Sequence, residues 1–123
     1  METDFLTQKV IGCAIEVHKQ LGPGLLESSY ESCLMYELHQ AGLIAKKQVT
    51  QSINYKGMKI DAGYRLDILL PDQLIIELKS VDRLAPIHTA QIITYLKLSG
   101  IKTGLLINFN VEKLTNGLKR ISV

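Results

Sequence analysis

The chain has 123 residues, of which 46% are hydrophobic and 21% charged, which is enough for one hydrophobic core and too apolar for a disordered protein. Its formal charge of +2 is compatible with a polyanionic partner but too small to indicate one. Cys13 and Cys33 lack the spacing of a zinc site and lie beside apolar residues, which favours packed, reduced thiols. The sequence shows neither a signal peptide nor an apolar run of roughly 20 residues, so we expect one cytoplasmic domain, residues 1–123, outside the membrane.

Two amphipathic helices are predicted at the start of the chain. Over residues 4–21 the apolar positions recur every three or four residues, and a similar stripe covers residues 25–41. Ser28 and Glu31 have the spacing of a capping box. The second helix is therefore expected to begin within a residue or two of Ser28, with Glu27 at its N-terminal edge.

After these helices the hydrophobic period changes from 3.6 to 2. Two strands are predicted, with a possible bend at Gly63 in the second, and the tripeptide "PDQ" then turns the chain into a third strand. A helix opened by Pro86, a further strand and a weak closing turn or edge segment follow. The predicted ranges are strands 47–55, 58–70, 74–80 and 102–110, helix 86–100 and closing segment 111–123. Helices, three antiparallel strands, a helix and a strand predict a mixed α/β (α+β) fold.

Charged residues interrupt both strands that flank the "PDQ" turn. A three-residue loop would pair Leu70 with Leu74 and place Asp67 opposite Glu77. A two-residue loop would mix apolar and charged positions along the whole ladder, so the three-residue loop is favoured. Strict alternation gives three sets of residues that share a face: Arg65, Asp67 and Leu69; Leu66, Ile68 and Leu70; and Ile75, Glu77 and Lys79.

In this register the carboxylates of Asp67 and Glu77 face each other with their β-carbons roughly 5 Å apart. Two such charges repel by roughly 3 kcal/mol at an effective dielectric constant near 20, which a divalent cation such as Mg²⁺ would offset. The alternative is a solvated face in which Arg65 and Lys79 form salt bridges with the acids. The apolar runs "ILL" and "LII" are typical of strands covered on both faces, and charged residues in a covered sheet are not solvated. These runs therefore favour the metal over the solvated face.

The spacing of Asp67, Glu77 and Lys79 resembles the signature of the PD-(D/E)XK nuclease superfamily, although Leu66 stands where that signature commonly has proline. The stretch "QIITYL", with Gln91, looks like the Gln-x-x-x-Tyr element of RecB-type exonuclease domains, in which Tyr95 would be the tyrosine. The stretch "GLLESSY", with Gly24, Glu27 and Tyr30, is similar to the motif of the GxxExxY family. The stretches "EVHKQLGPGLLES", "YRLDILL", "HTAQIITYLKLSG" and "GLLINFNV" also look like that family, so the resemblance covers nearly the whole chain.

The resemblance implies a restriction-endonuclease-like core and a site for one or two Mg²⁺ ions, with Mn²⁺ as a substitute. In such nucleases Asp67 and Glu77 would be metal ligands, Glu27 would contribute to the metal shell, and Lys79 would position or activate the attacking water. The resemblance also implies catalytic roles for Gln91 and Tyr95, which lie four residues apart on one helical face and could hydrogen-bond a phosphate or a water.

The leading hypothesis is therefore a Mg²⁺-dependent nuclease acting on nucleic acid, with DNA favoured over RNA. The alternative is a nucleic-acid-binding or protein-interaction module with the same fold and little activity, which would need a homodimer or a protein partner; a purely structural protein is a third. Tyr30 is favoured as a core aromatic, and His18 and His88 as structural or surface residues. No run of exposed aromatic residues suggests stacking on single strands.

Overall fold

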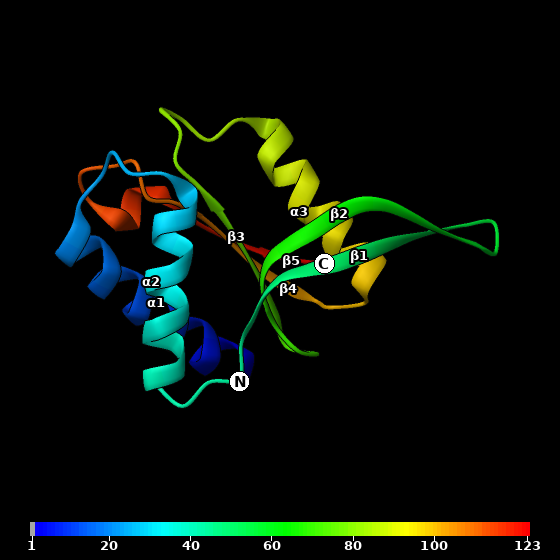
Figure 1. Ribbon diagram of the computed structural model, residues 1–123, viewed down its shortest axis with the longest axis horizontal. Helices are drawn as coiled ribbons and strands as arrows, with labels where there is room; N and C mark the ends of the chain where they lie inside the picture. Colours follow the sequence, from blue (N-terminus) through cyan, green and yellow to red (C-terminus); the bar gives the residue numbers. More distant parts are fainter. Residues whose placement is uncertain (1) are drawn as a thin grey trace.

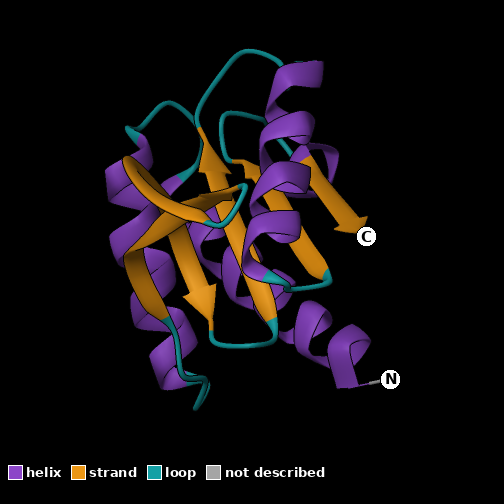
Figure 2. Ribbon diagram, turned by 90° about the vertical axis from the view of Figure 1, so that its right-hand side faces the viewer, coloured by secondary structure: helices purple, strands orange, loops and turns teal. Residues whose placement is uncertain are grey.

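Five strands form one mixed sheet with helices on both faces in the computed structural model, which describes residues 2–123 and side chains from Asp4 onward (Figures 1 and 2). Helices α1 and α2 lie on one face of the sheet and α3 lies on the other. The strand order is β1-β2-β3-β4-β5, with β3 and β4 parallel and all other neighbours antiparallel. The elements are α1 (Glu2–Leu21), α2 (Glu27–Gln40), β1 (Lys46–Tyr55), β2 (Met58–Leu70), β3 (Leu74–Lys79), α3 (Pro86–Ser99), β4 (Thr103–Asn108), η1 (Leu114–Gly117) and β5 (Leu118–Ser122).

The central strands are covered on both faces, as the apolar runs predicted. Every residue of β4 is buried, as are the first five residues of β3. One core cluster packs α1 and α2 against the sheet, and a second packs α3 against the opposite face. The parallel β3–α3–β4 unit and its covering helices are typical of α/β proteins, and the predicted mixed α/β class is confirmed.

The hairpin between β2 and β3 has the predicted three-residue loop. Leu70 pairs with Leu74 and Ile68 with Ile76, and the Gln73 N–H donates to the Leu70 carbonyl at 3.0 Å. Pro71 occupies the second position of this turn, and Asp72, at the third, has a φ of 63°, as in a type II turn. The predicted register is therefore confirmed from Leu70–Leu74 to Ile68–Ile76, the pair next to Asp67 and Glu77.

Strict alternation of faces along β2 is wrong at one position. Leu66 packs in the cluster beneath α3, whereas Ile68 and Leu70 pack beneath α1 and α2. Regular pairing is lost around Asp67, because the ladder to β3 ends at the Ile68–Ile76 pair and Gln48, across on β1, has a φ of 53°. The strand can therefore turn its side chains between Leu66 and Ile68.

The β1–β2 hairpin extends beyond the body of the protein (Figure 1). Most of its residues are exposed, and the pairing register shifts between Gln51 and Ile53. Gly63 lies across from this shift with a φ of 80°, a left-handed conformation that favours glycine. The predicted bend at Gly63 is thus a bulge near the base of a projecting arm.

The remaining predictions concern helix ends, cysteines and the last segment. Helix α2 begins at Glu27, close to the predicted position, but its N-cap is Leu26 with no side-chain cap bond, so the Ser28–Glu31 capping box is wrong. Cys13 and Cys33 are free and half-buried, as expected. The closing segment is a short 3₁₀ turn followed by an edge strand antiparallel to β4.

Candidate metal centre

Asp67 and Glu77 stand where the β2–β3 ladder ends, and their side chains replace its backbone acceptors. The Asp67 N–H donates to Glu77 Oε2 at 2.9 Å, and the Leu78 N–H donates to Asp67 Oδ2 at 2.8 Å. Each carboxylate thus receives a hydrogen bond from the strand opposite its own. This reciprocal arrangement holds the acidic pair, by which we mean Asp67 and Glu77, in place at the end of the β2–β3 ladder.

Burial and mutual repulsion both disfavour the charged form of this pair. Glu77 is 4% exposed, and burial, followed by the charge of Asp67, raises its pKa from 4.5 to about 8. The pKa of Asp67 is also raised, first by burial and then by the charges of Glu31 and Glu27, against the hydrogen bond from Leu78. The positive charge around the pair is therefore too small to return either pKa to its ordinary value.

Lys79 is the nearest source of positive charge, at the end of β3. It is half-buried, and its charge lowers the pKa of both Asp67 and Glu77. Its position is fixed from β4, because it pairs with Asn108 and its carbonyl accepts from the Phe109 N–H at 3.0 Å. The structure thus brings the predicted Asp67, Glu77 and Lys79 together.

Glu27 reaches this region from the N-terminus of α2. Its Oε2 accepts from the Ser80 N–H at 3.2 Å, and the Ser80 hydroxyl donates to the Leu25 carbonyl at 2.6 Å. These bonds join the start of α2 to the residue that follows Lys79. Among the described residues, however, no three His, Cys, Asp or Glu side chains are close enough together to form a metal cluster, so Glu27 lies beside the acidic pair rather than directly against it.

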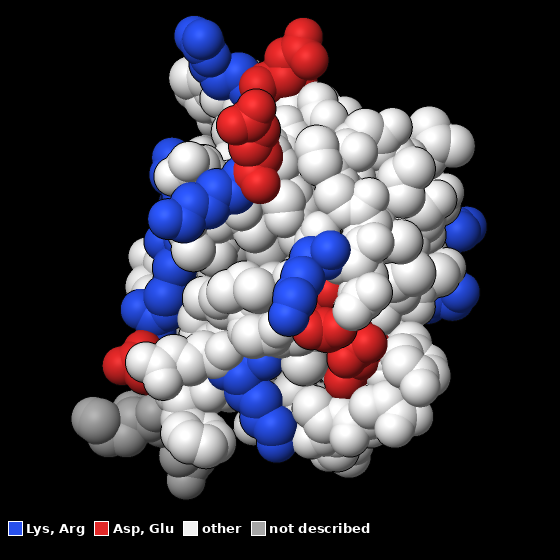
Figure 3. All heavy atoms as spheres, turned by 90° about the vertical axis from the view of Figure 1, so that its left-hand side faces the viewer, with Lys and Arg blue, Asp and Glu red and all other residues white. Residues whose placement is uncertain are grey.

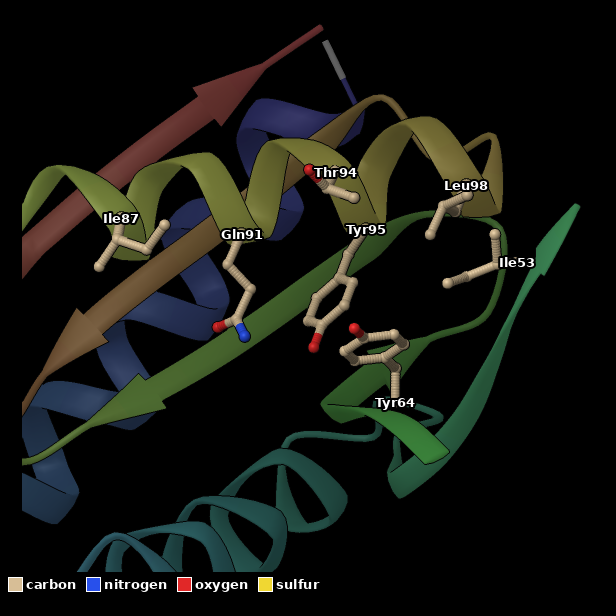
Figure 4. A pocket seen from close by; sticks show the side chains of 7 residues that line it. All are labelled: Ile53, Tyr64, Ile87, Gln91, Thr94, Tyr95 and Leu98. Carbon is tan, nitrogen blue, oxygen red and sulfur yellow. The ribbon is translucent and has the colours of Figure 1, made fainter. Parts of the chain in front are cut away.

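Gln91 and Tyr95 approach from α3. In Figure 4 the Gln91 amide and the Tyr95 hydroxyl project to the same side of the helix. Burial and then the charges of Glu77 and Asp67 raise the pKa of the Tyr95 phenol above 10.0, which places this phenol within electrostatic reach of the acidic pair. The predicted grouping of both residues on one helical face is confirmed.

Two residues that the sequence patterns did not identify also contribute to the surroundings of the acidic pair. Glu31, one turn beyond Glu27, is half-buried, accepts from Gln48 Nε2 at 2.7 Å and adds to the negative field at Asp67. Its i+4 spacing from Glu27 was the available signal. Asn108 is 2% exposed, and its side chain bonds the Val81 N–H at 3.1 Å and the Val81 carbonyl at 2.9 Å, which holds the chain just after β3.

The other candidates have structural roles. The Tyr30 hydroxyl donates to the Gly22 carbonyl at 2.6 Å and accepts from the Leu25 N–H at 3.1 Å, and its ring stacks on Phe109. His18 Nε2 lies 2.7 Å from the Val111 carbonyl, and His88 Nδ1 accepts from the Ala85 N–H at 3.0 Å. Tyr30 is thus a buried core residue, as predicted, and it orders the loop that leads to Glu27.

A mixed sheet that presents an acidic pair and a lysine at the end of a central hairpin defines the class of restriction-endonuclease-like proteins. A sequence profile of the PD-(D/E)XK nuclease superfamily matches residues 4–121, so the chain belongs to this superfamily. Comparison with curated proteins and with solved structures gives no significant match. The finer resemblances to the GxxExxY family and to RecB-type domains stay predictions.

Members of this superfamily are nucleases, generally depend on divalent metals and bind nucleic acid. None of the helices within residues 2–123 combines the length and the apolar character that crossing a bilayer requires. On the face that carries α1 and α2, basic and acidic side chains are interspersed, without one broad basic field (Figure 3).

Proposed function

We propose that this chain is a Mg²⁺-dependent nuclease that hydrolyses phosphodiester bonds in nucleic acid, with DNA favoured over RNA. The observation that supports this proposal is the acidic pair, in which Glu77 is almost fully buried 10 residues along the chain from Asp67 and hydrogen-bonded to its backbone. A purely structural pair bridged by Arg65 and Lys79 is disfavoured, because the only ion pair among the described side chains joins Asp4 and Arg120.

The residues present fit a divalent cation. Asp67 and Glu77 offer hard carboxylate oxygens, and burial, followed by the neighbouring acidic charges, raises the pKa of both groups, so two charged carboxylates at this place are disfavoured without a cation. We infer that these two residues hold Mg²⁺ or Mn²⁺, and that Glu27, tied to Ser80, contributes to the surrounding shell. When bound, such an ion polarises a phosphate oxygen and increases the acidity of water.

The remaining catalytic roles follow from side-chain chemistry. The Lys79 ammonium, close to the acidic pair, would stabilise the negative charge that grows on the phosphate in the transition state and orient the attacking water. The Gln91 amide and the Tyr95 hydroxyl, projecting together from α3, would hydrogen-bond phosphate oxygens and hold the substrate in line. A charged group from β3 and two neutral donors from α3 would thus act on the same phosphate.

A cleavage assay tests this proposal. Single- and double-stranded DNA and RNA oligonucleotides are incubated with Mg²⁺ or Mn²⁺ and the wild type, Asp67→Asn, Glu77→Gln or Lys79→Ala. We expect Lys79→Ala to lower the cleavage rate about 100- to 1,000-fold and the carboxylate variants at least as much. Asp72→Asn is the matched control, because Asp72 is an exposed carboxylate in the turn of the same hairpin.

Equal residual cleavage by the wild type and all three variants would rule out catalysis at this centre. Calorimetric titration with Mn²⁺ then distinguishes the binding-module alternative. Metal binding by the wild type that is lost in Glu77→Gln supports a catalytic centre. Retained oligonucleotide binding without any metal binding favours a module that acts with a second copy or a protein partner.

A further inference from the structure

A pocket of about 290 Å³ lies between α3 and the base of the β1–β2 hairpin (Figure 4). Its aromatic side is formed by Tyr64 of β2 and Tyr95 of α3, and Gln91 supplies an amide. Its remaining walls are largely apolar, with Ile53, Ile87 and Leu98. A volume just below the range of sites for drug-sized ligands suits one flat, ring-sized group rather than a peptide or a helix.

Two of the lining side chains are more exposed than a packing role would require. Tyr64 is 44% exposed, and Ile87, at the first turn of α3, is 69% exposed. Tyr64 lies with its ring centroid 6.4 Å from that of Tyr95, at an angle of 60°. One ring is thus fixed by burial while the other remains available to stack on a ligand.

The pocket lies near the acidic pair along β2, because Tyr64, which lines the pocket, stands three residues before Asp67 on this strand. The Tyr95 phenol, which also lines the pocket, has its pKa raised by the charges of Glu77 and Asp67, after burial. Gln91 also belongs to both sites, because it lines the pocket and is one of the residues proposed to bind the phosphate. A nucleotide with its phosphate at the acidic pair would therefore have its base close to Tyr64.

Stacking on aromatic rings and hydrogen bonding to an amide are the interactions by which proteins hold unpaired bases. Bases inside a duplex already stack on their neighbours and would have to leave the helix to enter such a pocket. We propose that this pocket binds an unpaired nucleobase next to the cleaved phosphodiester, so that the enzyme prefers single-stranded nucleic acid or frayed ends. The inference rests on the proposed function for the position of the phosphate.

The inference is tested by binding of fluorescein-labelled oligothymidylate, its abasic counterpart and a duplex, measured by anisotropy in Ca²⁺. Tyr64→Ala is expected to weaken binding of oligothymidylate about 5- to 100-fold and to leave binding of the abasic strand unchanged, because only the base stacks. Tyr64→Phe should retain most of the affinity, since the ring remains. Tyr36→Ala is the matched control, because Tyr36 is a similarly exposed tyrosine on α2, outside this pocket.

The wild type should bind the single strand more tightly than the duplex, and an oligouridylate arm shows whether the sugar matters. Equal binding of oligothymidylate by the wild type and Tyr64→Ala would overturn the inference, as would a preference for the duplex. Failure of the proposed function is distinguishable. If Tyr64→Ala selectively weakens binding but the wild type does not cleave, base binding in the pocket is supported and the proposed nuclease activity is wrong. If the wild type cleaves but Tyr64→Ala does not change binding, only the proposal of base binding is wrong.

Discussion

At the scale of single residues, the acidic pair combines two roles that usually fall to different groups. The carboxylates of Asp67 and Glu77 accept hydrogen bonds from backbone N–H groups that have no ladder partner at the end of the hairpin. The same carboxylates are the proposed metal ligands. Replacing a carboxylate by its amide keeps an oxygen acceptor at each position and removes the charge. Amide variants therefore separate a loss of chemistry from a loss of structure better than alanine variants do.

The raised pKa of Glu77 predicts that the metal-free protein loses stability as pH rises. In the folded chain this pKa is about 8, whereas the ordinary value is 4.5, so between these values the folded state binds a proton that the unfolded state does not. The stabilisation is complete below pH 4.5 and is lost as pH rises through 8, with a slope of up to ~1.4 kcal/mol per pH unit. Asp67, whose pKa is also raised, acts in the same direction.

Thermal unfolding in EDTA across this pH range measures the effect. Glu77→Gln should remove most of the slope, because a neutral amide does not titrate. Glu112→Gln, which changes an exposed carboxylate between β4 and η1, should follow the wild type. A wild-type unfolding temperature that is constant or rises over this window would contradict the assignment.

At the scale of elements, the region around the acidic pair is held together by contacts between segments far apart in sequence. Ser80 and Glu27 join β3 to α2, Tyr30 orders the loop before α2, and Asn108 of β4 holds Val81. The strands supply the acidic pair, but these links determine where α2 and the β3–α3 connection lie. Small changes in the links should therefore affect catalysis without touching the metal ligands.

Gly117 provides a test of one such link. A β-carbon built at this position would clash with the Asn108 carbonyl oxygen, and backbone cannot move aside as a side chain can. Gly117→Ala is expected to destabilise the protein by about 1–3 kcal/mol or more. It should also lower cleavage in the folded fraction, because Asn108 holds Val81 through its side chain.

Two other glycines are matched controls for this substitution. At Gly104 the added carbon meets Ile92 Cδ1 at 2.8 Å, the flexible end of a side chain, so Gly104→Ala should cost less than Gly117→Ala. At Gly12, inside α1, nothing lies within 4 Å, and Gly12→Ala should stabilise the protein by about 0.5–1 kcal/mol. Chemical denaturation of the three variants gives the order, and a Gly117→Ala protein as stable as the wild type would contradict it.

At the scale of the whole molecule, sequence patterns predicted those features that depend on one strand and its neighbour. The three-residue turn and its register follow from keeping apolar and charged positions apart along the ladder, and the covered β3 strand follows from its apolar run. Alternation failed at Leu66, because the positive φ of Gln48 and the divergence of β3 arise only in the assembled sheet.

Features that depend on which elements pack together were not predictable from one sequence. The contribution of Glu31 to the field at Asp67, the bonds from Asn108 to Val81 and the meeting of Tyr64 with Tyr95 each join segments that no local period connects. The position of Glu27 beside β3 was predictable in part. A motif suggested it, and the bond to Ser80 supplies its physical basis.

Metal binding should be visible as stabilisation of the whole fold, because the unfolded chain does not hold Asp67 and Glu77 together. Each tenfold increase in free Mg²⁺ or Mn²⁺ above the dissociation constant should add about 1.4 kcal/mol, or roughly 3–6 °C in unfolding temperature for a chain of this size. The increase should be larger at pH 8 than at pH 6, because a metal must displace the proton that the raised pKa of Glu77 retains. Thermal scans of Asp67→Asn and Glu77→Gln should show little increase, and Asp72→Asn should match the wild type. An identical metal response in all four proteins would place the ion elsewhere, and it would remove the reason for two unbalanced carboxylates at the end of a buried hairpin.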